Sequence, residues 1–144
     1  MVPLQEQKQN KNEETAEENK EEDKVQIGLT VDSFVIERWI RDRDVFVATA
    51  RELGAEVNVQ DAGADVKEQI SQIEYFINKQ VDVIVVIARD CGALSDAIQK
   101  AQSAGIPVIS YDRMVNNANT DLYISFDNRK VGEIMAQALV NATS

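Results

Sequence analysis

The stretch DVIVVIARD, residues 82–90, is an unbroken apolar run that ends in a base and an acid. A strand made from it has no polar face, so both of its faces must be covered, as in a parallel sheet flanked by helices. Apolar residues at helical spacing occur on both sides of it, over residues 64–80 and 92–105. The stretch therefore predicts the central strand of an α/β sheet.

The same alternation of strand and helix extends from Val25 to Asn141. We expect strands over 25–31, 55–60, 82–88, 107–112 and 122–126, helices over 36–54, 64–80, 92–105 and 128–142, and a longer loop at 114–121. In the first helix the apolar positions expected to face inward are Ile36, Trp39, Ile40, Val45, Ala48 and Leu53. Parallel strands need crossover connections, which helices supply with a right-handed sense. The predicted fold is a doubly wound parallel sheet in a three-layer sandwich.

Composition divides the chain in two and excludes several functions. Residues 1–24 contain almost nothing to bury and are expected to form a disordered acidic tether, whereas 25–144 form one lobe. A net charge of -10 argues against nucleic acid as a partner. The chain has no His and a single Cys, so no multi-Cys metal site is possible, and we expect no cofactor. No apolar run approaches the ~20 residues of a membrane span.

Polar side chains follow every predicted strand. In chain order they are Asp32 with Glu37, Arg38 and Trp39; Asp61; Arg89 with Asp90; Asp112 with Arg113; and Asp127 with Asn128. The carboxyl ends of parallel strands share one edge of the sheet, which is where open α/β sheets bind ligands. We therefore expect a binding site at this edge.

The residue types at this edge suit a small polyol. Carboxylates accept hydrogen bonds from hydroxyl groups, Arg donates in a planar fork, and an indole offers a flat apolar face. Other interpretations stay open: Asp112 and Arg113 could be a solvated ion pair, and Trp39 a core residue. Asp61 more simply makes a turn, and Asp127 or Asn128 caps the last helix.

Enzymatic alternatives fit the same positions less well. The turn after the first strand, DSFVIER, has no glycine, which argues against a dinucleotide-binding domain. A phospho-receiver domain could use Asp32 and Asp90, but the fifth strand ends in ISFDN, without the lysine that such a domain needs. We expect a binding protein and not an enzyme.

Four stretches resemble the amino-terminal lobe of bacterial type I sugar-binding proteins, the substrate-binding subunits of ABC importers. They are IERWIRDRDVF (36–46), QISQIEYFINKQVDVIVVIA (69–88), AGIPVISYDRM (104–114) and DLYISFDNRKVGEIMAQAL (121–139). ERW, RDRD, YDRM and YISFDN together resemble the D-xylose-binding branch. The resemblance covers 25 to about 142.

The resemblance implies roles for residues already singled out. Asp112 and Arg113 would bind the sugar, Arg38 would make a polar contact and Trp39 would stack on the sugar ring. The family often has an Asn after the third strand, where this chain has Arg89 and Asp90. Those two residues, and Asp32 from the strand-end pattern, are weaker candidates for ligand binding.

The implied function is non-catalytic capture of D-xylose, or a related pentose or hexose, between two lobes outside the cytoplasm. The partners would be a missing second lobe and a membrane permease, and the tether resembles the spacer of a lipid-anchored protein. One alternative is a sugar-sensing input for a membrane histidine kinase, with a role in chemoreception. Another is the effector domain of a lactose-repressor-type regulator, although no helix-turn-helix precedes the domain. A fifth strand left at an exposed sheet edge would favour self-association.

Overall fold

The computed structural model describes residues 24–143. Its elements are β1 (Gln26–Val31), α2 (Glu37–Glu52), β2 (Glu56–Asp61), α3 (Val66–Asn78), β3 (Val83–Ile87), α4 (Ser95–Ser103), β4 (Val108–Tyr111), β5 (Leu122–Ile124) and α5 (Asn128–Thr143). Each predicted strand and helix is present, in the predicted order. The predicted disorder of the tether concerns residues that lie, apart from Lys24, outside the described range.

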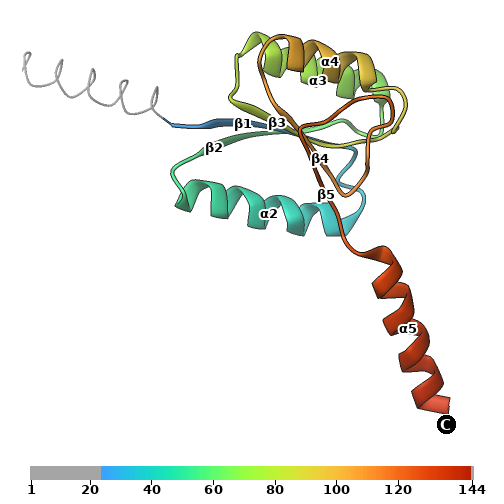
Figure 1. Cartoon of the computed structure of the whole chain (residues 1–144). Coiled ribbons are helices and arrows are strands. Elements are labelled where there is room, and N and C mark those ends of the chain that lie inside the picture. The colour runs from blue at the N-terminus through green and yellow to red at the C-terminus, as the bar shows by residue number, and fades with distance from the viewer. Residues whose placement is uncertain (1–23, 144) are drawn as a thin grey trace, which may run out of the picture.

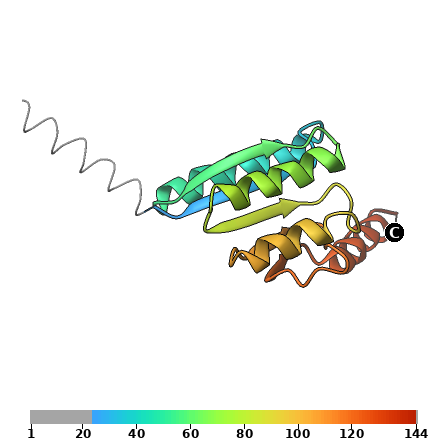
Figure 2. The ribbon, with the colours of Figure 1, turned by 90° about the horizontal axis from the view of Figure 1, so that it is seen from above.

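The five strands form one parallel sheet in the order β2-β1-β3-β4-β5. Helix α2 covers one face, and α3 and α4 cover the other (Figures 1 and 2). This confirms the doubly wound three-layer fold. All five strands point the same way, so their carboxyl ends lie along one edge.

The central strand β3 contributes to the core on both faces. Ile84 and Val86 pack with α3 and α4, whereas Val85 and Ile87 pack on the face that α2 covers. Beside β3, the backbone of Gly28 in β1 lies so close to α3 that a Cβ there would be 2.6 Å from Cγ of Phe76. A glycine is therefore required at this crossing.

Helix α2 buries fewer of its apolar residues than predicted. Trp39 and Ala50 are its buried residues, while Val45 and Leu53 are 67% and 81% exposed. The prediction is wrong for four positions, because only the row through Trp39, Phe46 and Ala50 reaches the sheet. The four exposed positions are Ile36, Val45, Ala48 and Leu53. Val45 and Leu53 lie instead along a groove that no described element covers.

The connection from β4 to β5 contains no helix. The loop between them is held by backbone and side-chain hydrogen bonds. Among them, the Asn116 N–H donates to the Cys91 carbonyl and the Val108 N–H donates to Asp121 Oδ2. Val115 is buried against the α3–α4 side of the core. The loop therefore takes the place of a crossover helix and connects two adjacent parallel strands.

Helix α5 extends away from the sheet (Figure 1). None of its residues is buried, although it carries several apolar side chains. Its first residue is Asn128, and the Asp127 carboxylate accepts from the Lys130 N–H. Of the two predicted caps, Asp127 therefore caps the helix and Asn128 does not.

Candidate ligand site at the carboxyl edge of the sheet

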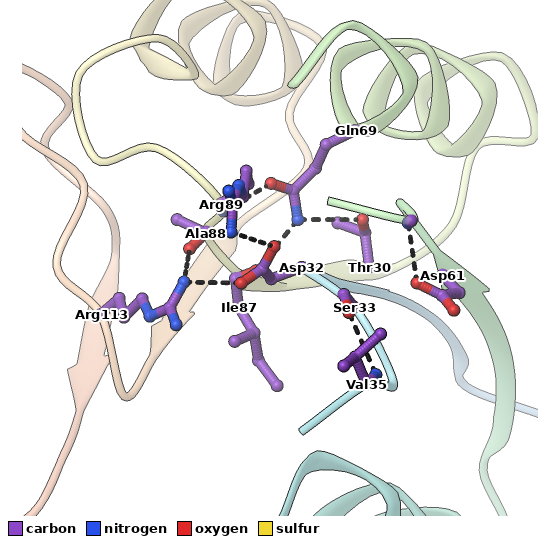
Figure 3. Close-up of polar contacts among 11 residues, drawn as sticks. Thr30, Asp32, Ser33, Val35, Asp61, Gln69, Ile87, Ala88, Arg89 and Arg113 are labelled. Atoms are coloured by element: carbon purple, nitrogen blue, oxygen red, sulfur yellow. Dashed lines mark hydrogen bonds and ion pairs between the residues drawn. The ribbon is translucent and has the colours of Figure 1, made fainter. Parts of the chain in front are cut away.

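Asp32, directly after β1, is the most deeply buried charged group at the edge. Its side chain is 2% exposed, and its Oδ2 lies 2.8 Å from Nη1 of Arg113. Arg89 Nη1 lies 3.6 Å from the other carboxylate oxygen, Oδ1 (Figure 3). That oxygen accepts no hydrogen bond within the part of the chain that the structure describes. Two arginines from different strand ends therefore neutralise one buried carboxylate.

Arg113 is fixed by more than this ion pair. Its Nη1 also donates to the Ala88 carbonyl at 2.9 Å, which ties the end of β4 to the end of β3. Its guanidinium lies 5.7 Å from the ring centre of Trp39. Since the side chain is still 31% exposed, Arg113 is held in place with part of its side chain open to solvent.

A second ion pair stands beside the first. Arg38 Nη2, at the start of α2, lies 2.6 Å from Oδ1 of Asp112, at the end of β4. The same guanidinium lies 4.2 Å from the Trp39 ring centre and 5.2 Å from that of Phe126. Charge pairing and cation–π contacts together hold Arg38 over the edge.

The backbone at Asp112 is unusual. Its φ of 63° lies in the left-handed region, which a non-glycine residue seldom adopts. Its N–H donates to the Ile124 carbonyl at 2.7 Å, and its carbonyl accepts from the Tyr123 and Ser125 hydroxyls. These bonds fix the conformation that turns the Asp112 carboxylate toward Arg38.

Trp39 is a core residue in this structure. It is 2% exposed and packs edge-on to Tyr111, with ring centres 6.4 Å apart. Its Nε1–H has no acceptor within the described range. A sugar could stack on this ring only if Arg38 moved off it, so stacking by Trp39 stays a prediction.

A buried polar network behind the edge was not predicted. Gln69 donates to the Ile87 carbonyl and to the Thr30 hydroxyl, and accepts from the Arg89 N–H at 2.8 Å (Figure 3). Gln72 accepts from the Thr30 hydroxyl and donates to the Asp61 carbonyl. The two glutamines bind the ends of β1, β2 and β3 into one unit. The sequence could have indicated these two residues, because Gln69 and Gln72 are three residues apart on the same helical face as the apolar residue Phe76.

Tyr111 links the site to α2. Its hydroxyl donates to Oδ2 of Asp42 at 2.9 Å, and the Arg38 Nε lies 3.8 Å from the same oxygen. Burial, and after it the hydrogen bond to Asp42, raise the pKa of Tyr111 above its usual value. The phenol therefore stays a neutral donor that fixes Asp42 beside Arg38.

The remaining strand-end acids serve the backbone. Asp61 accepts from the Gly63 N–H and makes the expected turn. Asp90 accepts from the Gly92 and Ala93 N–H groups, so its carboxylate caps a turn and meets neither ion pair. The structure thus brings together Asp32, Arg38, Arg89, Asp112 and Arg113, with Trp39 beneath them.

No cluster of three or more His, Cys, Asp or Glu side chains able to hold a metal ion occurs within residues 24–143. Over the same residues, every helix is too short or too polar to cross a membrane.

Comparison with known proteins shows the family of the chain. Residues 27–144 match a family model described as "Periplasmic binding protein domain". The chain belongs to this periplasmic binding protein family. It is 50% identical to the D-xylose-binding periplasmic proteins of Haemophilus influenzae and Escherichia coli K12, over 81% of its own length. A solved ABC transporter solute-binding protein from Actinobacillus succinogenes, with bound D-allose, superposes with a TM-score of 0.76 at 30% identity; the match covers 83% of this chain and 44% of that one.

The match covers most of this chain but only part of each relative. The chain spans about a third of the length of the two D-xylose-binding proteins, 35% and 36%. The chain therefore corresponds to about one third of each of these two relatives.

Proposed function

We propose that this chain is the amino-terminal lobe of an extracytoplasmic D-xylose-binding component of an ABC importer. It would supply one wall of a cleft in which a sugar is held by non-covalent contacts alone, with no catalysis. The observation that carries the proposal is the pair of adjoining ion pairs, Asp32–Arg113 and Arg38–Asp112, at the carboxyl edge of the sheet.

Each pair suits a neutral, hydroxyl-rich ligand. Every carboxylate is already matched to a guanidinium, so a sugar need not bring a counter-charge. The Asp112 side chain is 18% exposed and Arg113 31%, which leaves oxygen lone pairs and N–H groups that can reach ligand hydroxyls. Because the pairs are held by the backbone and by Ala88 O, little ordering remains to be done when the ligand binds.

A single lobe would hold such a ligand weakly. With one face of the sugar in water, each hydrogen bond replaces a bond to solvent and gains little. Tight small-molecule sites bury most of the ligand surface. We therefore propose a second lobe as the immediate partner and a membrane permease as the downstream one. Residues 1–24 would then be the spacer of a lipid-anchored protein.

Calorimetry tests this proposal. We expect D-xylose to bind the chain alone at about millimolar or weaker, and at about micromolar once the second lobe of the Escherichia coli relative is added as a separate chain. Asp112→Ala should weaken the two-lobe affinity by about two to four orders of magnitude, because two charge-assisted bonds are each worth roughly 1.5–3 kcal/mol.

The matched control is Glu74→Gln, which changes a carboxylate in a surface ion pair with Lys100, away from the edge. It should leave the affinity unchanged. Micromolar binding by the chain alone would contradict the two-lobe cleft. Equal effects of the two substitutions would contradict the role of Asp112.

A further inference from the structure

Gln69, in the first turn of α3, is a buried amide whose side-chain partners lie at the ends of β1 and β3. It is 0% exposed. Its Nε2 donates to the Ile87 carbonyl at 3.0 Å and to the Thr30 hydroxyl at 3.3 Å. Its Oε1 accepts from the Arg89 N–H at 2.8 Å. One side-chain amide, acting as donor and as acceptor, therefore holds two backbone groups on either side of a single residue.

The peptide unit 88–89, which Gln69 holds, lies beyond the end of the sheet. The register of β3 ends at Ile87 toward β1 and at Val86 toward β4. Ala88 is nevertheless 0% exposed, and buried backbone N–H and C=O groups need hydrogen-bond partners. Beyond the register of the strands, the orientation of this peptide plane is set by the side chains that bond to it.

Two side chains bond this peptide unit from opposite directions (Figure 3). Its N–H, which belongs to Arg89, donates to Gln69. Its C=O, which belongs to Ala88, accepts from Nη1 of Arg113 at 2.9 Å. The unit is trans, so its N–H and C=O point in opposite directions, and an N–H held toward α3 directs the carbonyl away from α3. The same Nη1 lies 2.8 Å from Asp32 Oδ2, so the contacts continue into the ion pair.

We propose that Gln69 is a positioning residue of the ligand site, which orients the Ala88 carbonyl and thereby fixes the direction of the Arg113 guanidinium. The role in sugar binding rests on the proposed function, whereas the chain of contacts does not. Each side chain that a ligand must immobilise weakens its binding, so an arginine fixed in advance favours affinity. Without the Gln69 amide, Arg113 keeps Asp32 as a partner but loses the oriented carbonyl that sets its direction.

Gln72 provides a matched control in the same helix and the same buried network. It is 4% exposed. It accepts from the Thr30 hydroxyl and donates to the Asp61 carbonyl and to Glu68. Substitution of Gln72 therefore removes as many hydrogen bonds as substitution of Gln69 but leaves the path to Arg113 in place. A role in stability alone would make the two substitutions equivalent.

Calorimetry measures the effect on binding, with D-xylose titrated into the chain together with the second lobe of the Escherichia coli relative. We expect Gln69→Met to weaken the affinity by about two- to tenfold, the cost of ordering one freed arginine side chain, and Gln72→Met to leave it unchanged. Gln69→Glu keeps an oxygen for the Arg89 N–H in either protonation state, so it should recover most of the affinity that Gln69→Met loses. In a chain that already carries Arg113→Met, Gln69→Met should weaken the affinity no further.

Urea unfolding of each variant shows that the lobe is folded and compares the stability that the two glutamine substitutions remove. Gln69→Leu, which also fits an apolar helix face, replaces Gln69→Met if that variant does not fold. Equal losses of affinity for Gln69→Met and Gln72→Met would overturn the proposal. So would a full effect of Gln69→Met in the Arg113→Met chain, because no guanidinium remains there to be positioned.

Nitrogen-15 NMR of the chain alone tests the positioning without a ligand. The two Nη groups of Arg113 should give separate signals, because a guanidinium held by two acceptors rotates slowly; Arg113→Met identifies these signals by removing them. The signals should merge in Gln69→Met and stay separate in Gln72→Met. Separate signals in Gln69→Met would overturn the proposal. If they merge there while the wild-type chain and second lobe fail to bind D-xylose, the positioning role is supported and the proposed function alone is contradicted.

Discussion

The Asp32–Arg113 pair should be asymmetric: removing the arginine should cost more stability than neutralising the aspartate. Asp32 is almost fully enclosed, with a side-chain exposure of 2%, whereas Arg113 keeps 31% of its side chain exposed. Arg113→Met keeps the alkyl stem but leaves a buried carboxylate with Arg89 alone, at 3.6 Å. Asp32→Asn keeps an oxygen that can still accept from Arg113, whose charge can be solvated.

The magnitudes follow from these exposures. Breaking a buried pair so that a charge is left uncompensated costs about 3–5 kcal/mol, and the remaining Arg89 should reduce this to about 2–3 kcal/mol for Arg113→Met. Asp32→Asn should cost about 0.5–1.5 kcal/mol, the usual net value of one hydrogen bond. In the double variant no uncompensated charge remains. Its loss in free energy of unfolding should therefore be smaller than the sum of the two single losses by about 1 kcal/mol or more.

Urea unfolding at neutral pH, followed by circular dichroism, gives the three free energies of unfolding. Arg41→Met is the matched control, because its partner Glu37 and Arg41 itself are both exposed, and it should cost less than about 0.5 kcal/mol. A larger loss for Asp32→Asn than for Arg113→Met would refute the reasoning, since it would mean that Asp32 is the solvated partner. Strict additivity would show that the two side chains are not coupled.

Three other perturbations test the packing and titration behind the site. Burial and the hydrogen bond to Asp42 raise the pKa of Tyr111, so on raising the pH the unfolded chain loses its phenolic proton before the folded chain does. The free energy of unfolding should therefore fall as pH rises above about 10. In urea unfolding measured over a series of pH values, Tyr111→Phe should reduce that fall. Gly28→Ala should lower the melting temperature, with a cost of about 1–3 kcal/mol, because its Cβ would clash with the Phe76 ring, and Phe76→Leu in the same chain should recover part of the loss in calorimetry. The Val108 N–H donates to Asp121 and lowers the pKa of that carboxyl. The free energy of unfolding should therefore fall as pH drops through and below about 4, and Asp121→Asn should make that fall smaller in urea unfolding.

The fold was predictable because its strongest signals are local. The apolar run of β3 needs covering on both faces, and the helical periods on either side of it supply the cover. The inward face of α2 was predicted less well, because its sequence is apolar in more than one direction and only the shape of the sheet selects the row through Trp39 and Ala50. The buried Gln69 was missed for a related reason: a polar residue in an apolar stripe is satisfied only by partners brought in from other strands.

The site was predictable as a set of residues at one edge and not as a set of pairs. Topology alone puts the residues after β1, β3 and β4 together, whereas the choice of partners depends on contacts between residues 74 and 81 positions apart. Those contacts change what the edge can bind. As a list, the acids suggested a polar surface; as pairs, Arg38, Arg89 and Arg113 balance Asp32, Asp42 and Asp112, three positive charges against three negative ones. Within this cluster of ion pairs the charges balance, so an ionic ligand finds no excess counter-charge there, while hydroxyl groups can both donate to the carboxylates and accept from the guanidinium groups. That balance is the physical reason for favouring an uncharged sugar over a phosphorylated one as the ligand.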